Sequence, residues 1–153
     1  MSTRSNIIVE DEKNRIQLYR HYNGAPYGEW GVLATLENAL PYAWHLPRYE
    51  ACEFAAALVR AWKEEGGGDI YIDGSPKGWE LVNEWADWVY VIKPHKETKP
   101  NPDRIDFRLS DPMIYVYDWN LGNMQLNKAN PQPVLKVKLS EARQTAFEWE
   151  HKA

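Results

Sequence analysis

The side chains best suited to binding chemistry gather near the start of the chain. They combine a guanidinium, an imidazole, an amide and two phenols, which are groups that bind anions and polar ligands. Arg4 precedes an aliphatic run and the others stand in the loop HYNGAPYG; the set is Arg4, His21, Tyr22, Asn23 and Tyr27. One hypothesis is therefore a small-molecule site, for a nucleotide-like ligand, at the end of an N-terminal hairpin. The structural alternative is that Arg4 anchors the N-terminus while His21 and Asn23 shape a turn.

Elsewhere the sequence offers no catalytic or metal-binding pattern. The four histidines lie far apart, and no pair has the spacing of metal ligands on a helix. The single cysteine, Cys52, excludes a disulfide within the chain, and we expect an inert, buried or half-buried thiol. Gly66-Gly67-Gly68 follows an expected helix instead of opening one, which is typical of a helix stop and not of a phosphate loop. The sequence predicts no metal, cofactor or catalytic residue, and leaves enzymatic activity open.

Aromatic and acidic residues favour a second class of function, the binding of another protein. The 153 residues include eight Trp and nine Tyr, and these side chains are enriched at recognition surfaces as well as in cores. An aromatic patch ringed by acids would suit docking to a partner. The expected interface residues are Glu50, Glu53, Glu64, Glu65, Trp79, Trp85 and Trp119.

Net charge and hydropathy argue against some classes of partner and some cellular locations. The net charge of −4 argues against direct nucleic-acid binding, which needs clustered Lys and Arg for the phosphates. No stretch approaches the length of a membrane-spanning helix, and the N-terminus lacks the apolar run of a signal peptide. Together with the single cysteine, these features predict a cytoplasmic protein with no membrane partner.

Hydrophobic periodicity predicts an α+β fold. The candidate strands are 6–9, 15–22, 69–73, 88–92, 104–109, 113–117 and 134–139, and in the second of them Ile16, Leu18 and Arg20 share one face. Helices are expected over 29–40, ending at Pro41, over 47–65 and over 141–152. We expect one domain spanning residues 1–153: an antiparallel or mixed sheet of about five to six strands, with two to three helices packed on one face.

The opening of the chain resembles that of a group of small proteins from phages and bacterial mobile elements. The matching residues are Thr3-Arg4-Ser5, His21 and Gly24, while Asn23 stands where the group usually has Asp and Ala25-Pro26 replaces Tyr-Pro. The resemblance implies a phage-like origin and a bacterial host cell. The expected function is then a non-enzymatic protein that binds and inhibits a host protein, such as a CRISPR–Cas or other defence component. The alternative is a protein that binds or modifies a nucleotide-like small molecule in a pocket at the end of the N-terminal hairpin.

Overall fold

The computed structural model describes residues 3–43, 49–65, 70–73, 86–94, 112–119 and 132–152. Strands are labelled β, α-helices α and 3-10 helices η. Their order along the chain is β1 (Ser5–Glu10), β2 (Arg15–Arg20), α1 (Val32–Thr35), η1 (Leu36–Tyr42), α2 (Ala51–Glu64), β3 (Ile70–Ile72), β4 (Trp88–Lys93), β5 (Met113–Asp118), β6 (Leu135–Lys138), η4 (Leu139–Glu141) and α3 (Ala142–Lys152).

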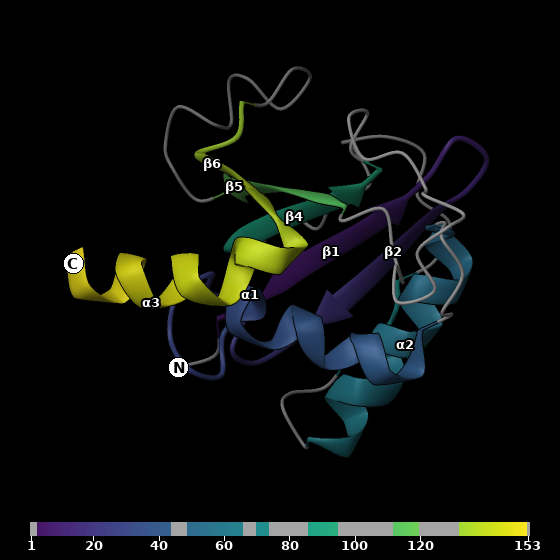
Figure 1. Ribbon diagram of the computed structural model, residues 1–153, viewed down its shortest axis with the longest axis horizontal. Helices are drawn as coiled ribbons and strands as arrows, with labels where there is room; N and C mark the ends of the chain where they lie inside the picture. The colour runs from purple at the N-terminus through teal and green to yellow at the C-terminus, as the bar shows by residue number, and fades with distance from the viewer. Residues whose placement is uncertain are drawn as a thin grey trace, which may run out of the picture.

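The strands form one mixed sheet in the order β3-β2-β1-β4-β5-β6. Central β1 pairs in antiparallel fashion with β2 and in parallel fashion with β4, so that Ile7 lies between Leu18 and Tyr90. The other neighbours are antiparallel. All three α-helices lie on one face of this sheet (Figure 1). The expected fold class is confirmed: an α+β fold with a six-stranded mixed sheet and three helices.

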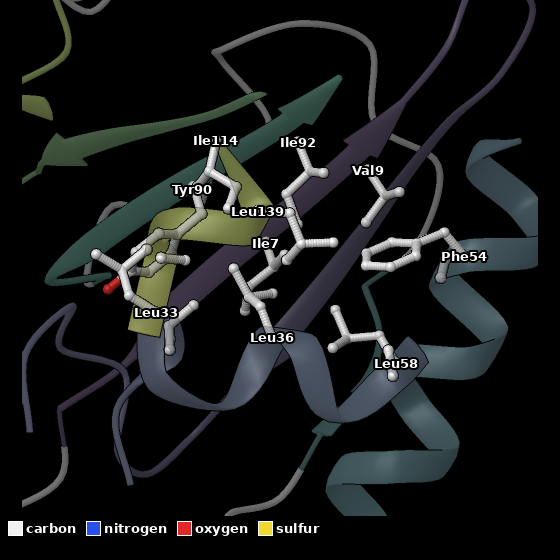
Figure 2. Packing of buried hydrophobic residues seen from close by; sticks show 14 of the residues in the cluster. Ile7, Val9, Leu33, Leu36, Phe54, Leu58, Tyr90, Ile92, Ile114 and Leu139 are labelled. Carbon is white, nitrogen blue, oxygen red and sulfur yellow. The ribbon is translucent and has the colours of Figure 1, made fainter. Parts of the chain in front are cut away.

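The main core lies between the sheet and the helices. Alternation along β1 and β4 turns every second aliphatic or aromatic side chain towards α1, η1 and α2, where the apolar helix stripes meet them. Each fully buried side chain of this size contributes roughly 1.5–3 kcal/mol to stability. Figure 2 shows this packing for Ile7, Val9, Leu33, Leu36, Phe54, Leu58, Tyr90, Ile92, Ile114 and Leu139.

A second cluster covers the opposite face of the sheet. It contains Ile8 of β1, Val89 and Val91 of β4, Tyr117 of β5 and Trp119, which follows β5. Only 2% of Trp119 is exposed, and its backbone N–H donates to the carbonyl of Asp87 at 3.0 Å. The prediction that Trp119 belongs to an exposed interface is therefore wrong, because this ring fills a core.

Most element predictions are confirmed, and the first helix differs most. Instead of a helix over 29–40, a loop runs to Gly31, which has extended backbone, and α1 starts at Val32. The chain then continues as the 3-10 helix η1, which contains Pro41 instead of ending before it. A proline ring fits helical φ, and its missing N–H removes at most one hydrogen bond from this short 3-10 segment.

The remaining differences are smaller. α2 begins at Ala51, after extended Glu50, while 44–48 fall outside the described residues. Cys52 is exposed, so the expectation of a buried or half-buried thiol is wrong. Trp79, Trp85, the predicted strand 104–109 and the glycine run 66–68 lie outside the described residues. Within the described part of the chain, no helix has the length and apolar character needed to cross a membrane.

Asp11 joins the β1–β2 turn to the start of α2. One carboxylate oxygen accepts hydrogen bonds from the N–H groups of Lys13 (2.8 Å) and Asn14 (2.7 Å), and the other accepts from Ala51 (2.8 Å). Partial burial disfavours the ionised carboxylate, but the three N–H donors outweigh it and hold the pKa of Asp11 below its ordinary value.

Asp11→Asn is expected to lower the free energy of unfolding by about 1–2 kcal/mol at neutral pH, since it weakens a turn and a helix cap together. Because the pKa of Asp11 is lower in the folded protein, the ionised carboxylate stabilises the fold at pH values above the ordinary pKa of Asp. This stabilisation is lost as the pH falls through the folded-state pKa. Urea unfolding of both proteins at about pH 7 and about pH 3 checks this, because the difference should shrink at the lower pH. Glu12→Gln, at an exposed neighbouring position, is the control. The account would be contradicted if the difference in the free energy of unfolding between wild type and Asp11→Asn did not change with pH.

Candidate interaction surface

The loop between β2 and α1, residues 21–31, is fixed from inside the protein by Arg20. This side chain is fully buried, with its guanidinium 4.1 Å from the ring centre of Trp62 in α2. Nε donates to the carbonyl of Tyr22 (3.1 Å), Nη2 to the carbonyl of Trp30 (3.0 Å) and Nη1 to the hydroxyl of Thr35 (3.3 Å). Burial lowers the pKa of Arg20 to about 10. One planar donor group thus ties both ends of the loop to the helices.

The middle of the loop packs tightly against the N-terminal segment. The N–H of Gly24 donates to the carbonyl of Thr3 at 3.0 Å, and a Cβ at this position would lie 2.7 Å from the same oxygen, so glycine is required. The hydroxyl of Tyr90, in the central strand β4, donates to the carbonyl of Gly24 at 2.5 Å. Asn23 takes a left-handed conformation (φ 55°), which Asn tolerates better than most residues. The loop therefore has a defined shape.

This fixed loop presents three aromatic side chains to solvent, and α3 adds a fourth beside them. The exposed fractions are 48% for Tyr22, 42% for Tyr27, 58% for Trp30 and 58% for Phe147. They are four of the seven large hydrophobic side chains that are exposed in the described part of the chain, so exposure of this kind is concentrated here. Figure 1 shows the loop passing beside α3 near the N-terminus. We call Tyr22, Tyr27, Trp30 and Phe147 the aromatic surface.

Two hollows flank Trp30 on the aromatic surface. The larger, of about 570 Å³, lies between the loop, α1 and α3, and Trp30, Phe147 and Arg143 contribute to its lining. The smaller, of about 260 Å³, is lined by Tyr22, Tyr27 and Trp30 among others. Because Gly28, Glu29 and Trp30 line both, the two hollows are neighbours. A partner whose side chains fill the hollows would also cover the exposed ring of Trp30.

Ring contacts hold Tyr27 in place while leaving part of it exposed. Its ring centre lies 6.3 Å from that of Trp88 in an edge-to-face arrangement and 6.0 Å from that of Trp149. Trp88 and Trp149 also meet edge to face, with their ring centres 6.0 Å apart. Such pairs contribute roughly 0.5–1.5 kcal/mol each beyond the area they bury. Tyr27 is therefore a pre-positioned side chain, and the same contacts join the loop to α3 and to β4.

A network around Arg143 fixes α3 against α1 and η1. Its Nη1 lies 2.6 Å from a carboxylate oxygen of Glu37, its Nε donates to the carbonyl of Ala34 (3.0 Å), and its Nη2 donates to the side-chain oxygen of Asn38 (3.0 Å). Phe147 stands one helical turn further along α3. The network thereby sets the position of Phe147 relative to Trp30.

The predicted ligand-binding residues form two groups that meet where the rings of His21 and Tyr22 pack edge to face, with their centres 4.6 Å apart. Arg4 and His21 flank the paired residues Ser5 and Arg20, and strand alternation places both on the sheet face opposite the helices. There the ring Nδ1 of His21 lies 2.7 Å from the hydroxyl of Tyr19. The other three residues, Tyr22, Asn23 and Tyr27, line the smaller hollow, whose lining includes neither Arg4 nor His21. Three of the five predicted residues therefore share this hollow.

The predicted acidic interface residues are divided as well. Glu64 and Glu65, at the end of α2, line a third hollow of about 410 Å³ beside η1. Glu50 lies near the opposite end of α2, where it lines a different hollow with Asp11 and Cys52, and Glu53 stands in the first turn of that helix.

Trp30 and Phe147 are not among the residues predicted from the sequence. Trp30 falls within the expected helix 29–40, but α1 starts after it at Val32 and the ring is exposed. On α3 the apolar face carries buried Ala142 and Ala146, and Phe147 lies off that face. Because Phe147 is a large apolar residue outside the buried stripe of its helix, its position in the sequence could have indicated an exposed binding residue.

Comparisons with protein families, with curated proteins and with solved structures each find no match to this chain. Within the described residues, no three His, Cys, Asp or Glu side chains are grouped so that they could hold a metal ion.

Proposed function

We propose that this chain is a phage or mobile-element protein that binds and inhibits a host protein through the aromatic surface. The observation that carries the proposal is the gathering of four exposed aromatic side chains around one loop that a buried arginine fixes. Contiguous exposed apolar area is unfavourable in water and is typical of surfaces that a partner covers. Trp and Tyr dominate the binding energy of many protein interfaces.

Pre-organisation supports binding more strongly than exposure alone. Ordering a mobile loop on binding costs free energy, roughly 0.5–1.5 kcal/mol for each immobilised flexible side chain. Here Arg20, Gly24 and the contacts of Tyr27 fix the loop before any partner arrives. Aromatic side chains also have few rotatable bonds, so Trp30 and Tyr27 lose little entropy when a partner packs on them.

The phage-like opening of the chain supports a host protein as the partner. Thr3 and Gly24, two of the residues that carry this resemblance, meet in the backbone hydrogen bond that holds the loop. In a protein of such origin a host protein is the natural target, and a component of CRISPR–Cas or of another defence system is the specific candidate.

Affinity capture tests the proposal. The full chain is immobilised and exposed to bacterial host lysate, in parallel with a Trp30→Ala/Phe147→Ala variant and with Tyr71→Ala, which removes a ring that is 49% exposed on β3. We expect mass spectrometry to find a host protein that wild type and Tyr71→Ala retain and the double variant loses, and we expect added wild-type chain to inhibit that protein's activity. If no host protein is retained, or the double variant retains it equally, the proposal is wrong.

A further inference from the structure

The aromatic surface continues into an acidic region. Asn38 lines both the hollow of about 570 Å³ beside Trp30 and the hollow of about 410 Å³ between η1 and the end of α2. The second hollow also has Glu37, Tyr42 and Glu64 in its lining. Together with the smaller hollow, which shares Trp30 with the first, these hollows are neighbours in a row that runs from the loop past α1 and η1 to α2. We call this row of three hollows the groove.

The charge of the groove is strongly one-sided. Among the described residues that line its three hollows, the acids are Glu29, Glu37, Glu64 and Glu65, and the only cation is Arg143. Arg143 is paired with Glu37 at 2.6 Å, and Arg60, which stands outside the lining, lies 3.3 Å from Glu64, so the four carboxylates outnumber the two arginines that pair with them. Three of the four acids, Glu37, Glu64 and Glu65, line the hollow at the end of α2, which is therefore the more negative end of the groove.

Neighbouring side chains hold the carboxylates at the acidic end in place. The hydroxyl of Tyr42 donates to one oxygen of Glu64, and Arg60 lies 3.3 Å from the other. These two contacts, that of Tyr42 first, hold the pKa of Glu64 below its ordinary value, so it is charged at neutral pH. The side-chain amide of Asn38 donates to Glu65 at 2.5 Å. Two oriented carboxylates at the end of α2 therefore face a hollow open to solvent.

We propose that the groove binds a cationic segment of the partner, with an apolar side chain packed on Trp30 and Phe147 and Lys or Arg side chains placed over Glu64 and Glu65. This inference rests on the proposed function, since it names the part of the partner that the aromatic surface holds. Charge complementarity selects this occupant: the four lining carboxylates outnumber the two arginines that pair with them, so an acidic segment would meet net negative charge. An arginine in the segment could also stack on the exposed indole of Trp30.

Because Glu64 is about half exposed, charge should act on selectivity and association rate more than on total affinity. The apolar side chain packed on Trp30 and Phe147 should supply most of the binding energy. The carboxylates at the acidic end should favour positively charged segments over neutral or negative ones. The two parts of the groove can therefore be tested separately.

Fluorescence anisotropy with three labelled peptides of about 12 residues provides the test. All share one Trp and two Leu, followed by four Lys, four Gln or four Glu. We expect the Lys peptide to bind wild type roughly 10-fold more tightly than the Glu peptide at low salt, with a smaller ratio at about 0.5 M NaCl. In Glu64→Gln/Glu65→Gln the ratio should fall by about 3-fold or more, since two of the four groove carboxylates are gone.

The matched control is Glu50→Gln/Glu53→Gln, which removes the same charge from the opposite end of α2 and should leave the ratio unchanged. Thermal unfolding of each variant verifies that it is folded. Equal binding of the three peptides, or a charge preference that Glu64→Gln/Glu65→Gln retains, would overturn the cationic segment while leaving aromatic docking intact. Binding that Trp30→Ala/Phe147→Ala does not weaken, or no binding of any peptide, would overturn the groove as a docking site. Failure of the proposed function itself would instead appear in the host-lysate capture.

Discussion

Replacing Arg20 with Met is expected to lower the free energy of unfolding by about 3–4 kcal/mol. Met has a similar length and could still pack on Trp62, but it donates no hydrogen bond. The carbonyls of Tyr22 and Trp30 and the hydroxyl of Thr35 would each lose a donor supplied by this side chain. Unsatisfied buried polar groups cost roughly 1–3 kcal/mol each, partly offset because Met needs no desolvation of a charge.

Chemical denaturation measures this loss, and in a domain of this size it should also lower Tm by about 10 °C. The matched control is Arg60→Met. Arg60 also lies over an aromatic ring, 4.2 Å from the centre of Tyr42, but its side chain is 64% exposed. We expect that variant to cost under about 1 kcal/mol. Equal costs for the two substitutions would show that Arg20 does not organise the loop.

The double substitution Trp30→Ala/Phe147→Ala is expected to weaken binding of the captured host protein by about 3–4 kcal/mol, a factor of roughly 150 to 1,000. Trp30 lines two hollows and Phe147 lines the larger one, so we expect both rings to be buried near the centre of the interface. Central aromatic residues carry most of the energy in such interfaces.

The same double variant should unfold within about 0.5 kcal/mol of wild type, because both rings are 58% exposed and contribute little to the core. Titration calorimetry gives the affinity and urea unfolding gives the stability. Tyr71→Ala should change the affinity by less than about 3-fold, since Tyr71 lies on β3, away from the lining of the groove hollows. A large affinity loss in Tyr71→Ala, or none in the double variant, would place the interface elsewhere.

The fold follows largely from local patterns. Alternation placed Ile16, Leu18 and Arg20 on one face, and the structure confirms this by pairing Leu18 with Ile7 and Arg20 with Ser5. Apolar residues from Ala51 to Trp62 recur at helical spacing within the expected helix 47–65, and this part of the chain is α2, with that side buried. Periodicity is enough for these elements because each of them turns one continuous face into the core between the sheet and the helices.

Other features depend on contacts between distant parts of the chain. Arg20 lies on the apolar face of β2, yet its complete burial depends on Trp62 in α2 and on loop carbonyls, which no local pattern reveals. Trp119 and Trp30 are the same residue type with opposite environments, one in a core and one at the surface. Composition alone could not separate them, since large aromatic side chains serve both roles.

The candidate site was therefore predicted in part. Tyr22, Asn23 and Tyr27 of the loop HYNGAPYG line one hollow of the groove, and Glu64 and Glu65 line another. Arg4 and His21 are absent from the lining of the first of these hollows, although the ring of His21 contacts that of Tyr22 with the centres 4.6 Å apart. Phe147 joins the site only through packing of α3 on α1, a long-range contact that the Arg143 network fixes.

Hydrogen–deuterium exchange of the full chain, alone and with the captured host protein, tests the central claim most directly. We predict increased protection in residues 21–31 and 142–149, which carry the aromatic surface, with a smaller increase at 37–42 and 61–65 along the groove. Residues 70–73 should exchange equally in both samples. Protection confined to 70–73, or to the start of α2 around Glu50 and Cys52, would contradict the account.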